Sequence, residues 1–583
     1  MNKKIRDLLF VLILIGSAFR IAPILFYHPA LGLIGGSFGF GTKLMIIPLI
    51  LGMLYTLYCY IVKKDKDVLV FSKKAAIFAC FYLGVMYISF AWGLWNFPFL
   101  DQAAHGVHDF GQMGKVQTIL SIIGISLPKE SLILVMMAIR TAKNIIIDFI
   151  WQFGGVYLIY CWYRKEPERL IKMVALGVTF LVIIEIINTA LEWLYLAGNL
   201  WAKHVLEIIT PFFHPVNLPY HPTSSRVLWP GQIRGTFTEP SYFGMFCAFA
   251  LPFLWYQLIA CENKRTKAVY GILTLVMAFN IFITSSRTAL GLFLVEILML
   301  VLVGLYIHKK KLLIMVGIAI ALNLFGLGAG NYYMSHIMAP NMVNLITFGI
   351  YSPKPSKSNQ PQAKPGKSNQ PQAKPGKSNQ PQTKPGKSNQ PQAKPGKSNQ
   401  PHTTLHDYID RNLMSLTDIN KRSNRSRFTI AITHIRIGLD HPVLGVGFAL
   451  RQPYVGKYLK GQKLNPEINR WQDAQKRLGI WVESFPNLGE YWVRFAEGGI
   501  LGLLAYLVIP IILVIRLVKI VLHKKSLIYG IVLTSLIGCM GIGLGDTMTI
   551  LYVYWLILGV GFALTASSES SNDVGKDNSD APM

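Results

Sequence analysis

Cysteine is scarce in this chain, and the positions of the few cysteines exclude a disulfide-stabilised domain. The chain of 583 residues has six cysteines, and all six lie within apolar segments or at the ends of such segments. The largest polar stretch, residues 330–499, has none. A disulfide framework or a cysteine metal site needs cysteines gathered in a folded polar part of the chain. We therefore expect no disulfides and no metal site built from cysteine.

Motifs that bind metals or nucleotide phosphates are also missing. The chain has no His-Glu-x-x-His sequence and no Asp-x-Asp pair in the segments that we place outside the cell below. Gly-Lys-Ser recurs, but without the upstream glycine spacing and the flanking strand and helix of a phosphate-binding loop. We expect chemistry that needs neither a metal ion nor a cofactor.

Acidic residues are few: 29 Asp and Glu stand against 57 Lys and Arg, which gives a formal net charge of +28. In a soluble protein such a charge would indicate nucleic acid as the partner. Here the positive charge lies in loops and in one repeat, so we expect no nucleic acid. Anionic membrane lipids, lipid-linked phosphates or an acidic wall polymer fit this charge better.

What the chain has in abundance is long apolar runs. Hydrophobic residues make up 52% of it, and the mean hydropathy is +0.39. The run lengths predict an all-α polytopic membrane protein with about twelve transmembrane helices. The first run lacks a small-residue cleavage site, so we interpret it as an uncleaved span. The predicted spans are residues 8–26, 44–62, 75–97, 145–163, 173–196, 242–260, 268–283, 289–307, 312–329, 500–518, 527–544 and 548–564.

The orientation of the spans follows from the charge of the short connections. Every second connection is rich in Lys and Arg, and the connections between them are poorer in positive charge. The positive-inside rule then places both termini in the cytoplasm of a cell-membrane protein. The predicted parts are spans one to nine at residues 1–329, a large extracellular loop at 330–499, spans ten to twelve at 500–564 and a cytoplasmic tail at 565–583.

The first part of the extracellular loop, residues 351–401, is built on a repeat. From Lys357 the decapeptide Lys-Ser-Asn-Gln-Pro-Gln-Ala-Lys-Pro-Gly occurs four times, once with Thr383 in place of Ala, and a fifth copy ends at Pro401. Apolar residues are nearly absent and Pro recurs too often for helix or sheet, so we predict a disordered basic spacer. It either lies along an anionic wall polymer or is a repeat expansion without function.

The second part of the loop, residues 402–499, is predicted to be folded and helical. Phe428, Ile432, Ile435 and Leu439 form an apolar stripe at helical spacing, which predicts an amphipathic helix. Arg427 and His434 share a face next to this stripe, so both can point at one ligand.

Two short polar runs lie at the membrane ends of apolar segments. Arg-Gly-Thr-Phe-Thr-Glu-Pro-Ser at residues 234–241 precedes one span, and Ser-Ser-Arg-Thr-Ala at 285–289 separates two others. The predicted topology puts Arg234 and Arg287 on the outer membrane face. Two arginines there form a place to hold an anion, unless they are ordinary interfacial anchors.

These runs and two later motifs together carry a family resemblance. The later motifs are His-Pro-Val-Leu-Gly-Val-Gly at residues 441–447 and Glu-Gly-Gly-Ile-Leu-Gly-Leu-Leu at 497–504, at the end of the outer loop. In this order and spacing the chain resembles the O-antigen ligase/polymerase superfamily, and within it the Wzy-type polymerases of capsular and exopolysaccharide pathways.

The resemblance implies a metal-independent glycosyltransferase on the outer face of the cytoplasmic membrane. Such an enzyme joins polyprenyl-pyrophosphate-linked oligosaccharide repeat units, with a flippase and a chain-length regulator as possible partners in the membrane. The essential arginines of the family map onto Arg234 and Arg287. Family members often have a histidine near the end of the outer loop, whereas residues 485–492 have none here, and Glu490 stands in that region.

The chemistry of the residues agrees with this interpretation. Fixed arginines stabilise the charge of a departing pyrophosphate, and Arg234 and Arg287 are the natural clamp. The acceptor hydroxyl needs a base to take its proton, for which the candidates are Glu239 and Glu490, followed by His434 and His441.

Each candidate base also has an ordinary structural explanation. Glu239 can cap the helix that begins after it. Glu490 can form an ion pair with Arg494, four residues further on. His434 can be a solvated helix residue, and His441 can serve the turn before Pro442.

A few ionisable residues fall within or beside the predicted spans. They either extend to the membrane surface and pair inside the bundle, or they form the relay of a transporter. The rival functions are therefore a lipid-linked sugar flippase and, within the enzyme class, a ligase that moves finished glycan to another acceptor. These ionisable residues are Arg20, Arg140, Asp148, Glu185, Glu192 and Glu296.

Overall fold

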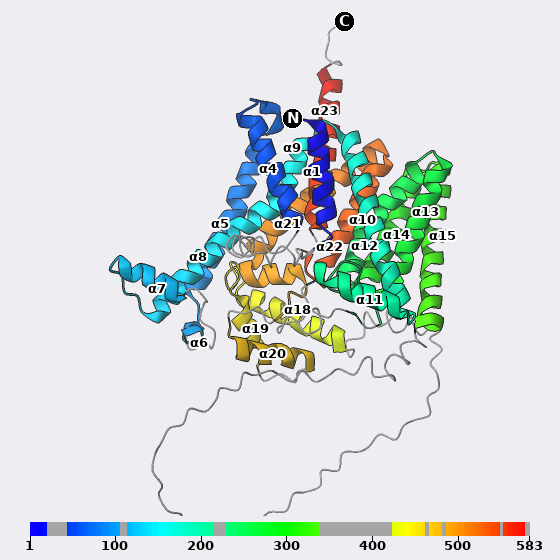
Figure 1. The fold of residues 1–583 in the computed structure, drawn as a ribbon. Helices are drawn as coiled ribbons and strands as arrows, with labels where there is room; N and C mark the ends of the chain where they lie inside the picture. The colour runs from blue at the N-terminus through cyan, green and yellow to red at the C-terminus, as the bar shows by residue number, and fades with distance from the viewer. Residues whose placement is uncertain are drawn as a thin grey trace, which may run out of the picture.

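The fold was analysed in a computed structural model of the chain (Figure 1). It describes residues 1–19, 44–70, 72–104, 113–214, 228–229, 231–338, 422–460, 466–480, 485–548 and 552–577. All regular structure in these ranges is helical, so the predicted all-α class is confirmed. The decapeptide repeats and Arg20 lie outside the described residues.

The helices indicate a multi-pass membrane protein. Seven of those described are long and apolar enough to cross a membrane, and three shorter apolar helices fall on further predicted spans. The total of about twelve spans stays a prediction. The longer helices are α1 (Lys3–Gly16), α4 (Ile46–Ile61), α5 (Lys73–Trp95), α8 (Lys129–Phe149), α9 (Gly155–Tyr163), α10 (Pro167–Leu196), α12 (Pro240–Ala260), α13 (Lys264–Ile283), α14 (Arg287–Ile307), α15 (Lys310–Tyr332), α21 (Glu490–Lys524), α22 (Leu527–Ile542) and α23 (Val553–Asp577).

Helix α12 is the most buried of the seven long helices. Its side chains are apolar and aromatic on all sides, and a helix of this kind is stable only inside a bundle. It packs against α10, α13, α14 and α22. Pro240 stands in its first turn, where the missing N–H costs no hydrogen bond. The polar run before α12 is therefore attached to the centre of the bundle.

The two ends of the bundle differ. Figure 1 shows the start of α1 and the far end of α23 at one end, and the short helices α18 (Arg422–Asp440), α19 (Arg451–Leu459) and α20 (Pro466–Leu478) at the other. We call the second end the loop end. That it faces the outside of the cell stays a prediction from the charge pattern. Helix α23 continues into the predicted tail.

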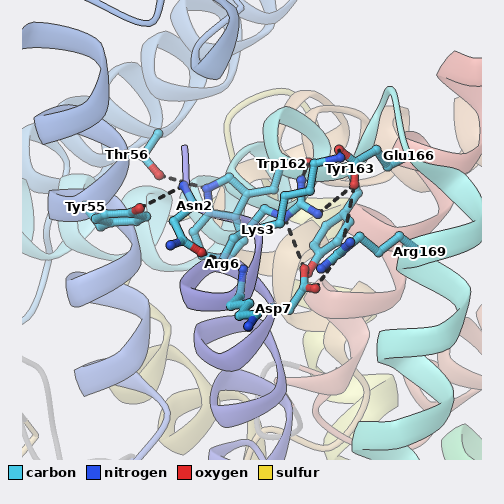
Figure 2. A network of polar contacts seen from close by, with 11 residues as sticks. Asn2, Lys3, Arg6, Asp7, Tyr55, Thr56, Trp162, Tyr163, Glu166 and Arg169 are labelled. Atoms are coloured by element: carbon cyan, nitrogen blue, oxygen red, sulfur yellow. Dashed lines mark hydrogen bonds and ion pairs between the residues drawn. The ribbon is translucent and has the colours of Figure 1, made fainter. Parts of the chain in front are cut away.

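A network of charged groups holds α1 to the junction of α9 and α10 (Figure 2). The guanidinium of Arg6 donates to the carboxylate of Glu166 at 2.9 Å, and Asp7 accepts from the hydroxyl of Tyr163 at 2.8 Å and from Arg169 at 2.6 Å. Partial burial alone would raise the pKa of Glu166, but hydrogen bonds from Arg6 and Lys3 lower it to about 2. These bonds compensate the desolvation of the charges at this end.

Helix α18 forms where the stripe predicted a helix, but it packs through the opposite face. Ile430 and Ile437 are buried against the bundle, whereas Phe428, Ile432 and Leu439 are exposed. The packed face also carries polar side chains whose partners lie on α19, on α20 and in the connection after α22, so tertiary hydrogen bonds contribute to which face is buried. Apolar content alone did not identify the packing face.

Candidate functional site

The turn that contains Arg234 is held by two glutamates of α10. Glu192 Oε2 accepts the backbone N–H groups of Arg234 at 3.0 Å and of Gly235 at 2.9 Å. Glu185 Oε2 accepts the backbone N–H of Thr236 at 3.0 Å, and Glu185 Oε1 accepts the hydroxyl of the same threonine. The two glutamates, which the sequence left open as ion pairs or as a relay, thus bind a loop backbone.

Arg234 lies deep in this turn. Only 2% of it is exposed, its Nη1 donates to the carbonyl of Thr238 at 3.2 Å, and its guanidinium lies 5.7 Å from the ring centre of Trp229. Burial lowers the pKa of Arg234, while the charges of Glu192 and Glu239 oppose this effect. An arginine remains cationic under such conditions. The turn therefore presents a fixed positive charge.

Arg287 lies at the same end of the bundle as this turn. It is the first residue of α14, whose N-cap is Ser286, and the Ser286 hydroxyl accepts the N–H of Ala289. The start of α14 touches the start of α12, because a Cβ on Gly244 would come within 2.4 Å of the Ala289 methyl group. Arg287 is partly exposed, unlike Arg234.

Glu239 interacts electrostatically with two of the predicted cations. Its charge acts on Arg234 and also on Arg427 of α18. It is the N-cap residue of α12, but its side chain makes no capping hydrogen bond. The carboxylate is partly exposed at the loop end. The structure therefore does not support the explanation that the Glu239 side chain caps α12.

Asp546 is a site residue that the sequence reasoning missed. Arg427 Nη1 donates to Asp546 Oδ2 at 3.0 Å and to the carbonyl of Gly545 at 2.9 Å. Burial alone would lower the pKa of Arg427, but the charge of Asp546 raises it. The backbone N–H of Glu490 donates to the carbonyl of Asp546 at 3.1 Å. A lone aspartate between two predicted spans was the signal for this residue.

Glu490 forms the ion pair that its spacing allowed. Glu490 Oε1 accepts from Nε of Arg494 at 2.9 Å and from its Nη2 at 2.7 Å, and both residues are buried. The Arg494 guanidinium also lies 5.0 Å from the ring centre of Tyr506. This arrangement orients the carboxylate toward Arg494.

His434 is buried away from this cluster. It is fully buried, its Nε2 lies 3.2 Å from Nη1 of Arg451, and Nε of Arg451 lies 3.3 Å from a carboxylate oxygen of Glu497. Burial and the charge of Arg451 lower the pKa of His434 well below its usual value. The histidine is therefore neutral, and it is not the solvated helix residue that the sequence allowed.

The two late motifs pair with each other. Gly447 N–H donates to the carbonyl of Glu497 at 3.0 Å, and Ile500 N–H donates to that of Pro442 at 2.8 Å. Gly499 has φ +60°, and a Cβ there would come within 2.4 Å of the Val443 backbone. His441, which precedes this turn, packs edge-on against a tyrosine of α19. The motifs thus join the loop to α21.

His214 is a second residue that the sequence reasoning missed. It is 2% exposed, and its Nδ1 has no hydrogen-bond partner in the described part of the chain. Burial and the charge of Arg234 lower the pKa of His214 well below its usual value, and the backbone of Gly235 opposes this shift. A histidine followed by Pro215 gave no sequence signal beyond a turn.

The described residues contain no group of three or more His, Cys, Asp or Glu side chains that could hold a metal ion. What the loop end gathers is a different set of groups. Arg234, Glu239, Arg427 and Asp546 form one electrostatic cluster, with Glu490 beside it and Arg287 on the neighbouring helix end. Cations of this kind can bind an anionic oligosaccharide carrier, and a carboxylate among them can accept a proton.

The described helices indicate a multi-pass membrane protein with this cluster at one end of the bundle. Residues 272–507 match the O-antigen ligase family. Over this region the chain is similar to that family, and the match supports the O-antigen ligase/polymerase superfamily, whose members act on lipid-linked oligosaccharides. The match includes Arg287 and the late motifs but not Arg234. No curated protein and no solved structure matched the chain.

Proposed function

We propose that the chain is a polysaccharide polymerase. It joins polyprenyl-pyrophosphate-linked oligosaccharide repeat units on the outer face of the cytoplasmic membrane, by transferring the growing glycan from its lipid onto the next unit. The observation that carries this proposal is the position of Glu239, whose charge acts on both Arg234 and Arg427 at the loop end. A carboxylate that interacts with nearby cations combines a proton acceptor with an anion site.

In this proposal Arg234 and Arg287 stabilise the pyrophosphate that leaves the donor glycan. Their charge is fixed by the fold, so no metal ion is needed for the step. Arg427 binds the lipid-linked substrate from the side of α18, where Asp546 orients it. Glu239 takes the proton of the acceptor hydroxyl as that oxygen attacks the anomeric carbon.

Glu490 and His434 have lower rank as candidates for the base. The Glu490 carboxylate is engaged by Arg494 in two hydrogen bonds. His434 is fully buried against Arg451, so it stabilises the folded loop and does not contact substrate.

A ligase that transfers finished glycan to another acceptor is the second candidate, because the matched family carries that description. The same arginine clamp serves both reactions. Against the transporter alternative, Glu185 and Glu192 bind the backbone of the Arg234 turn, which gives two of its three candidate coupling glutamates a structural role.

The test is the size and location of the lipid-linked glycan in cells that carry Arg287→Ala, Arg287→Lys or the unchanged chain. A polymerase defect leaves single repeat units on the outer face of the membrane. Arg287→Lys should restore little polymer, because a point charge replaces a planar fork of donors.

The matched control is Arg265→Ala, which removes an exposed arginine near the start of α13, at the opposite end of the bundle. It should give polymer of normal length. Full-length polymer that stays on its lipid in the Arg287 variants would indicate a ligase. Single units on the inner face would indicate a flippase. Normal polymer from both Arg287 variants would exclude Arg287 as a residue that stabilises the leaving pyrophosphate.

A further inference from the structure

Three consecutive backbone N–H groups in the Arg234 turn point at carboxylates. Those of Arg234 and Gly235 donate to Glu192, and that of Thr236 donates to Glu185. Successive N–H groups of a turn commonly form a concave binding site for an anion. Here the acceptors are carboxyl groups of the protein itself, and both are buried in the bundle.

We propose that Glu185 and Glu192 are positioning residues that hold the Arg234 turn in the geometry needed for glycan transfer. This inference rests on the proposed role of Arg234. A buried carboxylate is costly unless several hydrogen bonds stabilise it, and this turn supplies four. The turn and the two glutamates therefore stabilise each other.

Gly235 makes the close approach possible. Its φ is +57°, which favours glycine, and a Cβ at this position would lie 2.1 Å from Glu185 Oε2. The Arg-Gly-Thr motif thus needs glycine at its second position, because a side chain there would collide with Glu185. The motif and the two intramembrane glutamates form one structural unit.

The rotation of α10 about its axis is also determined. Glu185, Thr189 and Glu192 stand four and three residues apart, which places them on one face of the helix. Asn280 of α13 donates to the Thr189 hydroxyl at 3.2 Å and accepts from the indole N–H of Trp193 at 3.0 Å. These bonds keep both glutamates directed toward the turn.

One consequence concerns the substrate. Because the three N–H groups of the turn already donate to glutamates, they do not bind the pyrophosphate of the carrier. The anion must be held by side chains, so the place of the Arg234 guanidinium matters. A small shift of the turn moves this charge, since the side chain extends from the clamped residue itself.

The test measures the accessibility of Arg234 directly, without any substrate. The full-length protein in detergent is treated with phenylglyoxal, which modifies arginine, and the rate at each arginine is followed by mass spectrometry. Thr236→Val removes the hydroxyl but keeps the shape of the side chain, and Thr236→Ser keeps the hydroxyl. We expect Thr236→Val to raise the rate at Arg234 about five-fold, the size of one lost hydrogen bond. Thr236→Ser should behave as the unchanged chain.

Glu192→Gln and Glu296→Gln form the second matched pair. Both replace a buried carboxyl group in a long helix with an amide, but Glu296 makes no hydrogen bond in the described part of the chain. Glu192→Gln should raise the labelling of Arg234, and Glu296→Gln should not. If Glu192→Gln does not fold, the threonine pair decides.

Arg494 serves as the internal reference, because it is buried in a separate ion pair. Equal labelling of Arg234 in Thr236→Val and the unchanged chain would overturn the proposal. A parallel rise at Arg494 would also overturn it, since the glutamates would then support the bundle as a whole. Faster labelling of Arg234 together with polymer of normal length would show that the glutamates hold the turn. It would also refute the proposed role of Arg234 in glycan transfer.

Discussion

The guanidinium of Arg427 lies 3.0 Å from the carboxylate of Asp546 and joins α18 to the connection between α22 and α23. The side chain of Asp546 is 6% exposed and that of Arg427 is 33% exposed. The contact spans more than a hundred residues of sequence, and the charge of Glu239 at the start of α12 acts on the same arginine.

We predict that Asp546→Asn and Arg427→Ala each reduce polymer length in cells by about an order of magnitude, the effect of misplacing a substrate-binding cation. The exchange of the two charges, Arg427→Asp with Asp546→Arg, should not recover it, because the exchange restores the link but leaves no substrate-binding cation on α18. Polymer length on gels of cell-surface glycan gives the measurement.

Arg436→Ala is the control for this pair, because Arg436 is exposed on the same helix. It should leave polymer length unchanged. If Asp546→Asn also gives polymer of normal length, the contact does not orient Arg427.

Gly235→Ala should be more damaging than its size suggests. The backbone conformation alone costs about 1–2 kcal/mol for a residue with a side chain. The added methyl group would also meet Glu185 Oε2 at 2.1 Å. We expect loss of polymer and a lower Tm of the purified protein.

Gly291→Ala is the matched control, since nothing lies within 4 Å of a Cβ added there on α14. Its polymer length and Tm should equal those of the unchanged chain. Equal Tm values for the Gly235 and Gly291 variants would mean that the turn relaxes without strain.

The stability of the folded loop should depend on pH through His434. Burial and Arg451 keep the folded-state pKa of His434 well below 6.5, whereas the unfolded chain takes up a proton near that pH. The free energy of unfolding therefore falls as the pH decreases below 6.5, by up to about 1.4 kcal/mol per pH unit for this one group. The charged neighbours are Arg451 and, behind it, Glu497.

His434→Gln keeps a hydrogen-bond acceptor for Arg451 but has no proton to gain in this range. Its Tm should fall less than that of the unchanged chain between pH 7 and pH 5. Parallel Tm curves would mean that another group, such as His214, accounts for the acid sensitivity.

The positions of most of the long apolar helices could be predicted from the sequence, because the thickness of a bilayer sets the length of an apolar segment, but α8 begins at Lys129, well before the predicted span at 145–163. The sequence could not predict that residues 441–447 pair with α21 around its kink at Gly499. This pairing depends on backbone hydrogen bonds between residues far apart in the sequence. The sequence showed that Glu185 and Glu192 lie within a predicted span, where burying a carboxyl group costs free energy. It could not show that their partner is a backbone turn, because such a turn has no sequence signal of its own. The prediction that α18 packs through its apolar stripe was wrong for the same reason, because tertiary hydrogen bonds have no signal in the local sequence.

Of the candidate bases, Glu490 can be separated from Glu239 by a double substitution. Glu490→Gln leaves Arg494 as a buried cation without its carboxylate, which costs about 3–5 kcal/mol. A loss of polymer in this variant therefore reports lost stability as well as lost chemistry. The Tm of the purified protein should fall together with the polymer length.

Glu490→Gln combined with Arg494→Met removes both charges and fills the space with a side chain of similar length. Replacing a whole buried pair is often close to neutral for stability, so the Tm should return. If the polymer returns with it, Glu490 serves the fold and Glu239 is the base that remains. If the Tm returns while the polymer stays absent, and Glu239→Gln retains polymer, the proton acceptor is Glu490 and the assignment to Glu239 is wrong.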